Sequence, residues 1–261
     1  MRNLQVQQNR LEHSQAKIAS GKSIVKASDD AAGFAIAENI RAQISGVNKA
    51  KENAFNAQSM LQIGDGAMNE INNILIRVRE LGIQSASDNV SDKERALIDE
   101  EVQALLKESD RIAKSTRFGN LSILDGGLED LQFHVGPYGT EENKIRVDID
   151  ADATNGGLDI DGISLGDKGD AVDALETVDK AMESLATMRA KFGALQSRFS
   201  RTVSNLENQE VNLSSAKSRI IDADIAKESA EMASSRILHQ AGISILAQAN
   251  QNGASALRLI G

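Results

Sequence analysis

The chain has 261 residues, and aromatic side chains make up only 3% of them, with no Trp, one Tyr and six Phe. A compact globule of this size relies on bulky rings to fill its core, whereas this composition is typical of long helices that meet along narrow seams. The net charge of −9 is spread along the chain without a basic patch, and with so few stacking rings it argues against a nucleic-acid-binding surface.

Cysteine is absent, which excludes a disulfide scaffold and thiolate metal sites. No apolar run is long enough to cross a bilayer, so we expect no membrane partner. The first residues, MRNLQVQQ, lack the apolar segment of a cleavable secretory signal.

The N-terminal half has the periodicity of helices. Leu4, Leu11 and Ile18 predict a short first helix that Gly21 closes, and residues 21–35 are interpreted as a loop that leads into a second helix. That helix repeats apolar residues every seven positions. The repeat is Ile40, Val47, Ala54, Leu61, Met68 and Leu75, with Ala50, Ala57, Gly64, Ile71 and Val78 as a companion series.

A third helix is predicted after a break. Gly82 and residues 87–90 end the second helix, and the sequence Ser-Asp-Lys-Glu at 91–94 is a capping box that starts the next one. Its apolar positions are Ile98, Val102, Leu105 and Ile112.

The middle of the chain, residues 121–169, changes to a period of two and is rich in glycine. Leu131, Phe133 and Val135 alternate with polar residues, as do Ile145, Val147 and Ile149, and the linker at 136–140 joins the two runs. The pattern predicts a β-hairpin with one buried face.

The C-terminal half contains the longest repeat. The seam is Val178, Leu185, Phe192, Phe199, Leu206, Leu213 and Ile220, and three residues after each of the first six come Ala181, Met188, Leu195, Thr202, Gln209 and Ala216. Asp170 and Asp173 suit the first turn of this helix. If the helix continues to about residue 250, it spans roughly 120 Å. The predicted fold is mainly α, a long antiparallel coiled-coil-like helical bundle with a small β-hairpin insert, and the two chain ends are expected side by side.

Catalytic and metal-binding patterns are missing from the sequence. His13, His134 and His239 are scattered and form no metal-ligand motif. Asp148, Asp150 and Asp152 are spaced like calcium ligands, but Ala153 stands where the loop needs glycine, and position twelve is Asp159. A solvated strand edge explains this run better. We expect no enzyme, no metal site and no cofactor.

Four sequence segments resemble the bacterial flagellin family in the expected order. They are SDDAAGFAIA at 28–37, RVRELGIQSA at 77–86, SRIIDAD at 218–224, and QAG at 240–242 followed by LAQANQ at 246–251. The resemblance covers nearly the whole chain and implies a structural subunit that polymerises into the flagellar filament for swimming motility.

The resemblance also implies an organisation into tubes. Residues 1–27 and 221–261 would be the N- and C-terminal inner-tube helices, residues 28–120 the N-terminal outer-tube helices, residues 121–169 the hairpin insert, and residues 170–220 the C-terminal outer-tube helix. The loop from Lys22 to Ala32 would be the spoke between the tubes. The expected self-assembly residues are Leu4, Leu11, Ile18, Ile237, Leu238, Ile245 and Leu246.

Family membership implies further partners. The subunit would be exported unfolded through the flagellar type III apparatus to the extracellular filament, without a cleaved signal peptide. It would polymerise with itself or with other flagellins, bind an export chaperone through its C-terminal segment, and meet hook-associated junction and cap proteins. A host innate immune receptor is a possible partner, and the matching positions are Arg77, Leu81, Gln84 and Glu108.

The sequence differs from the family pattern at its beginning and in its middle. The first residues resemble a point inside the N-terminal helix, so the family's opening segment is expected to be missing, and the variable surface domain is absent. Two alternatives stay open: a hook–filament junction protein with similar terminal helices, and a non-flagellar coiled-coil scaffold.

Overall fold

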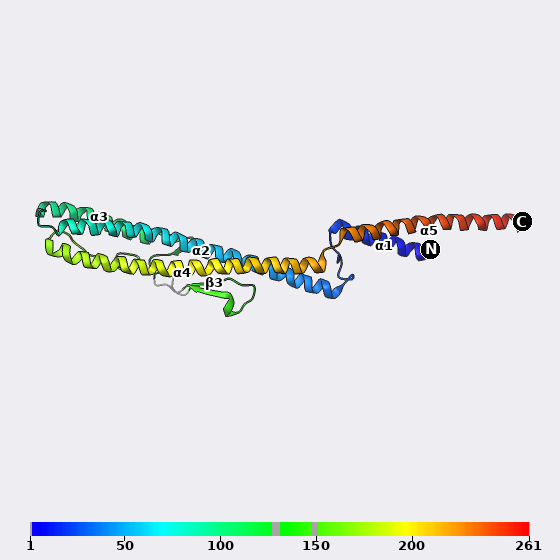
Figure 1. Cartoon of the computed structure of the whole chain (residues 1–261), viewed down its shortest axis with the longest axis horizontal. Helices are drawn as coiled ribbons and strands as arrows, with labels where there is room; N and C mark the ends of the chain where they lie inside the picture. The colour runs from blue at the N-terminus through cyan, green and yellow to red at the C-terminus, as the bar shows by residue number, and fades with distance from the viewer. Residues whose placement is uncertain (1, 127–130, 148–150, 261) are drawn as a thin grey trace. The chain divides into compact units, whose positions relative to one another are not determined.

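The computed structural model describes residues 2–126, 131–147 and 151–260, and for residues 250–260 it describes the backbone alone. Within these residues the chain is mainly helical, as predicted (Figure 1). The helices are α1 (Arg2–Ser20), α2 (Ala31–Ser85), α3 (Asp92–Ser115), α4 (Lys168–Ile221) and α5 (Ile225–Ile260). The short elements between α3 and α4 are β1 (Arg117–Phe118), β2 (Leu121–Ser122), β3 (Leu131–His134), the 3-10 helix η1 (Glu141–Asn143) and β4 (Lys144–Val147).

The chain forms two compact units, which are described separately. The terminal unit consists of residues 1–45 and 210–261, and the central unit of residues 46–209. The boundaries fall inside α2 and α4, so both long helices contribute to each unit.

The core of the central unit lies along the predicted seam. In the two repeats with a spacing of seven residues, every member from Val47 to Leu75 and every member from Val178 to Leu206 is buried. Phe192 and Phe199 are among the largest side chains that are fully enclosed. At Gly64 on α2, an added Cβ would lie 2.6 Å from Cε1 of Phe192. The glycine therefore lets α2 and α4 approach closely around this ring.

The capping box predicted for α3 is present. The backbone N–H of Glu94 donates to the Ser91 hydroxyl over 3.4 Å, and the Glu94 carboxylate accepts the Ser91 backbone N–H over 2.8 Å. This reciprocal pair satisfies two amides that no helical carbonyl reaches. Arg77 of α2 contacts Glu101 of α3 over 2.8 Å, so these two helices lie side by side in the central unit.

The predicted hairpin is formed by β3 and β4, which pair antiparallel with Phe133 opposite Ile145. The Phe133 ring meets Phe199 of α4 edge to face at 5.7 Å, and this contact holds one face of the hairpin against the seam. Ile149, which the pattern assigned to the second strand, lies outside the described residues. A second pair, β1 with β2, was not predicted, because two-residue strands are too short to show a period.

In the terminal unit, α1 and α5 run antiparallel. Lys17 lies beside Glu228, and Leu4 packs against Gly242. The connections at the ends of α1 and α4 are also joined through their backbones: Ser23 N–H donates to the Ile221 carbonyl over 2.5 Å, and Ala223 N–H donates to the Gly21 carbonyl over 3.0 Å.

A continuous helix from residue 170 to about 250 therefore does not form. The chain leaves the helix after Ile221 because its next residues pair with the segment after α1, and Gly21 allows that turn with a φ of +66°. Asp224 then starts α5, because its carboxylate accepts the N–H groups of Ala226 and Lys227. Asp30 starts α2 in the same way, so the helix begins at Ala31, inside the segment from 21 to 35 that was predicted as a loop.

Candidate functional site

The predicted self-assembly residues divide into two groups in the terminal unit. Leu4, Leu11, Ile18 and Leu246 are half-buried, and Leu4 packs against α5. The other group, Ile237, Leu238 and Ile245, is exposed on α5, with Ile237 at 68% and Ile245 at 67% of full accessibility. Only the second group presents most of its apolar surface outside the unit.

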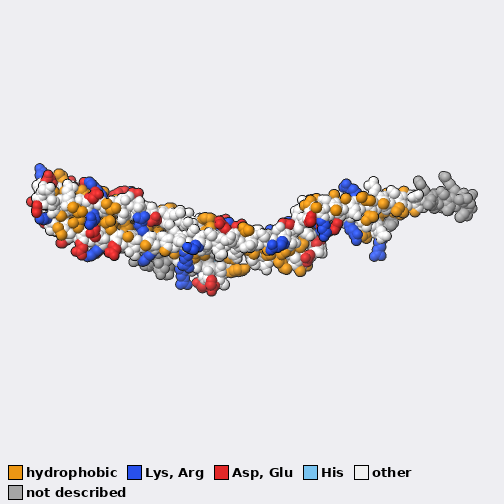
Figure 2. All heavy atoms as spheres, in the orientation of Figure 1, with side chains coloured by type: hydrophobic (Ala, Val, Ile, Leu, Met, Phe, Trp, Pro, Cys, Tyr) orange, Lys and Arg blue, Asp and Glu red, His pale blue; other side chains and the backbone are white. Residues whose placement is uncertain are grey.

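Other exposed aliphatic side chains extend this surface. Ile225 and Ile243 on α5 and Val6 on α1 are exposed as well, and hydrophobic side chains are visible on this part of the molecule (Figure 2). Val6 and Ile243 were missed because the sequence reading followed one apolar face of each helix.

The interior of the α1–α5 pair is polar. Ser14 is the only buried residue of α1. Lys17 Nζ lies 3.1 Å from Glu228 Oε1, with side-chain exposures of 19% and 9% respectively. A pair of helices that meets through serines and an ion pair gains little from hydrophobic burial. Several of its apolar side chains, Ile237 and Ile245 among them, remain largely exposed.

The predicted spoke loop is organised by two consecutive aspartates. The Asp29 carboxylate accepts the backbone N–H groups of Lys26 at 2.8 Å and Val25 at 3.0 Å. The Lys26 amide is the main cause that lowers the pKa of Asp29 below its ordinary value of 3.8, because hydrogen bonds to a carboxylate favour the charged form. The side chain of Ile24 is buried and anchors the loop.

The four positions matched to receptor recognition lie in the central unit but do not share one environment. Arg77, Gln84 and Glu108 are exposed, and Arg77 pairs with Glu101 and Glu80 while Glu108 pairs with Arg111. Leu81 is only 2% exposed and belongs to the hydrophobic core. It is therefore corrected from a surface contact to a core residue.

The described residues hold no cluster of His, Asp or Glu that is arranged to bind a metal ion. Asp148 and Asp150 lie outside these residues. Asp152 accepts hydrogen bonds from the backbone N–H and the hydroxyl of Thr154, which makes it a turn-forming residue. His13 is exposed, and His134 and His239 are half-buried in separate units.

Among the described helices, none combines the length and the apolar character that a membrane crossing needs.

Comparison with known proteins covers both ends of the chain. Residues 1–128 match the bacterial flagellin N-terminal helical region, and residues 175–260 match the bacterial flagellin C-terminal helical region. The chain is 35% identical to a flagellin of Halalkalibacterium halodurans, over 99% of this chain and 95% of that protein. It is 34% identical to the flagellar filament 33 kDa core protein of Treponema phagedenis, over 99% of this chain and 93% of that protein.

Solved structures agree with this fold. The crystal structure of Bacillus cereus flagellin is 27% identical, with a TM-score of 0.53, and the match covers 64% of this chain and 94% of that one. A putative flagellar hook-associated protein from Vibrio parahaemolyticus has a TM-score of 0.63 at 11% identity, which shows a common fold alone, over 74% of this chain and all of that one. From its two matched regions and its near full-length relatives, the chain belongs to the bacterial flagellin family, whose members are the structural subunits of flagellar filaments.

Proposed function

We propose that the chain polymerises through its terminal unit into the inner tube of a flagellar filament. In this proposal residues 1–27 and 221–261 are the inner-tube helices, residues 28–120 and 170–220 are the outer-tube helices, and residues 121–169 are the hairpin insert. The spoke is the loop organised by Asp29 and Asp30. The two halves of the inner-tube segment are α1 and α5, which already pair within one chain.

The observation that carries the proposal is the exposed aliphatic surface of α5. Ile237, Leu238, Ile243 and Ile245 each expose half or more of their surface. Fully burying a side chain of this size contributes about 1.5–3 kcal/mol. A single chain does not gain this free energy, whereas neighbouring subunits that cover α5 do.

The test is the polymerisation of a double variant, Ile237→Ser with Ile245→Ser. We expect the concentration needed for filament growth to rise strongly, because two contact side chains lose their apolar surface. The melting temperature of the central unit should not change, since neither residue lies in it. Val172→Ser, at an exposed site of the central unit, is the matched control and should leave polymerisation close to that of the unaltered chain. Normal filament growth by the double variant would refute the role of α5.

Two other assignments predict different products in the same assay. A hook–filament junction protein would add to filament ends and then stop growth, whereas a flagellin extends seeds without limit. A coiled-coil scaffold would form discrete dimers visible by negative-stain microscopy. Because a putative hook-associated protein shares the fold of this chain, the fold alone does not distinguish a junction protein from a flagellin. Seeded growth is the measurement that distinguishes them.

The remaining partners follow from family membership and the exposed ends. We expect an export chaperone to cover α5 before secretion, since an exposed aliphatic face of this size risks premature association. Type III export would deliver the chain to the extracellular filament without a cleaved signal peptide, alone or together with other flagellins. Hook-associated junction and cap proteins would then meet the filament at its two ends. The subunit has a structural role and no catalytic one.

Recognition by a host innate immune receptor remains a proposal for three positions. Arg77, Gln84 and Glu108 are exposed in the central unit, so they are available in the free chain. Their ion pairs with Glu80, Glu101 and Arg111 give them a structural role as well. Binding of the free chain to the receptor, compared with an Arg77→Ala variant, would test the assignment.

A further inference from the structure

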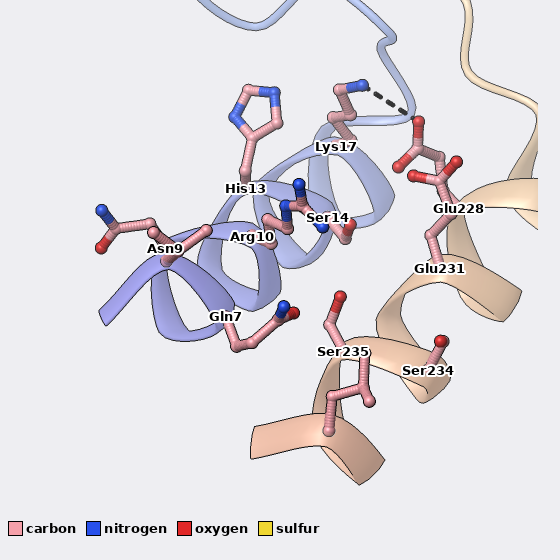
Figure 3. A pocket seen from close by; sticks show the side chains of 12 residues that line it. Gln7, Asn9, Arg10, His13, Ser14, Lys17, Glu228, Glu231, Ser234 and Ser235 are labelled. Carbon is pink, nitrogen blue, oxygen red and sulfur yellow. Dashed lines mark hydrogen bonds and ion pairs between the residues drawn. The ribbon is translucent and has the colours of Figure 1, made fainter. Parts of the chain in front are cut away.

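A polar cleft of about 740 Å³ lies between α1 and α5 in the terminal unit (Figure 3). Its α1 wall carries Arg10, His13 and Lys17, spaced three and four residues apart so that they share one helix face. Its α5 wall carries Glu228 and Glu231, one turn apart, followed by the exposed Ser234. The cleft therefore has a basic side and an acidic side.

One carboxylate oxygen in this cleft has no hydrogen-bond donor. Lys17 Nζ contacts Oε1 of Glu228 at 3.1 Å, but Oε2 of the same side chain is buried, and no donor among the described residues reaches it. The amide oxygen of Gln7 is also buried without a donor. Buried polar atoms in native proteins nearly always have partners. A buried carboxylate oxygen without a donor is a costly exception, because a charged group needs more compensation for its lost hydration than a neutral one.

The missing partner must be a hydrogen-bond donor, and a cation would also complement the negative charge of the acidic wall. A half-turn of the Glu228 carboxylate only exchanges its two oxygens, so one of them stays without a donor in either orientation. Glu231 stands on the same wall and is exposed, which adds a second acceptor at the mouth. A guanidinium or ammonium group can donate hydrogen bonds to both glutamates on the α5 wall. The basic side chains on the opposite α1 wall suit an acidic side chain of the same neighbour.

We propose that a second copy of this chain inserts an arginine or lysine side chain into the cleft and donates to Glu228 and Glu231. The proposal rests on the proposed function, because a filament subunit has further copies packed against it. It adds to the aliphatic contacts of α5 a polar contact that fixes position. Hydrophobic surfaces tolerate sliding, whereas a charged group in a matching cleft selects one relative placement of two subunits.

The first test asks whether the cleft closes in the filament. The chain has no cysteine, so a Ser234→Cys variant carries one thiol at the cleft. N-ethylmaleimide should label it readily in the monomer, and labelling should be largely lost in filaments. Labelling of the unfolded variant gives the full rate as a control. Filaments that form normally and still label at the monomer rate would overturn the proposal and leave the proposed function intact.

The second test asks whether the occupant is a cation. Glu231→Lys should raise the concentration needed for polymerisation roughly tenfold or more, because like charges would then meet in the cleft. Glu231→Gln should have a smaller effect in the same direction. The control is Glu70→Lys, the same charge change at an exposed position of α2 in the central unit.

The outcomes of the second test are also decisive. A larger effect of Glu231→Lys than of Glu70→Lys supports the cleft contact. Equal effects would mean that net charge alone matters, and water would then be the partner of Glu228 in the filament. If the unaltered chain does not polymerise from seeds, the proposed function fails together with this inference.

Discussion

The central and terminal units use apolar side chains in opposite ways. In the central unit the seam from Val178 to Leu206 is buried, and Phe192 and Phe199 are fully enclosed. In the terminal unit the same repeat continues, but Leu213 and Ile220 are only half-buried, and Ser14 is the one buried residue of α1. The central unit can be stable as a single chain, whereas the terminal unit keeps much of its apolar surface for other chains. One heptad pattern thus serves folding in one region and assembly in the other.

Limited proteolysis should give the largest contrast between the two units. Ordering a residue costs about 1–2 kcal/mol of conformational free energy, and the α1–α5 pair buries too little to offset this over its length. We expect the monomer to be trimmed to a fragment near residues 28–219, while filaments resist at both ends. A monomer whose ends survive as long as its centre would show that the terminal unit is stable alone.

Truncation of a seam ring should test the central unit directly. Phe192→Ala should lower the free energy of unfolding by about 3–5 kcal/mol, because it removes a fully buried ring and leaves a cavity. Phe55 is exposed on α2, so Phe55→Ala should change the free energy of unfolding by about 0.5 kcal/mol or less. Urea unfolding of both variants measures the difference. Equal losses would mean that the seam is not the core.

Replacing either of two nearby glycines on α2, Gly64 and Gly66, by alanine should change the stability in opposite directions. In Gly64→Ala the new Cβ would lie 2.6 Å from Cε1 of Phe192 and 2.9 Å from Cγ2 of Ile123, so overpacking should cost about 1–3 kcal/mol. Gly66 has open space around its Cα, and Gly66→Ala should stabilise the helix by about 0.8–1.0 kcal/mol. Thermal unfolding would contradict the close packing at Gly64 if both variants were stabilised.

The smallest effect is expected in the spoke loop, at Asp29. Its pKa lies below 3.8 in the folded chain because the Lys26 amide donates to the carboxylate. Its contribution to stability is therefore present above pH 3.8 and is lost as the pH falls through the lower folded value. The side chain is solvent-exposed, so the change should be confined to the loop. An NMR titration checks the direction, and a folded pKa at or above 3.8 would contradict it.

Much of the fold could be predicted because it is repeated along the sequence. A seam sustained over six heptads is hard to mistake, and the capping box before α3 and the alternation in β3 and β4 are local signals with a clear physical cause. The break after Ile221 was different. The heptads run up to it with one internal glycine, Gly193, and no proline, and the break depends on backbone pairing with a segment about 200 residues earlier. Contacts of that range leave no local pattern.

The candidate site was predicted in composition but not in orientation. Apolar residues of α1 and α5 were identified, yet the sequence did not separate Leu4, which packs within the pair, from Ile237, which faces outward. That separation depends on how the two helices are rotated about each other, and Ser14, Lys17 and Glu228 decide the rotation by occupying the interior. From the sequence alone, polar residues are assigned to the solvent-exposed face of a helix, even where they lie at the centre of a helix pair.

The short backbone pairing between residues 21–23 and 221–223 has a consequence for sequence change over evolutionary time. Its hydrogen bonds join main-chain atoms, while side chains matter at Gly21, which has a positive φ, and at Ile221, which is buried. Length is constrained as well, because one inserted or deleted residue on either side would shift the pairing and reverse which side chains face inward. Insertions and deletions within these two segments should therefore be eliminated among descendants.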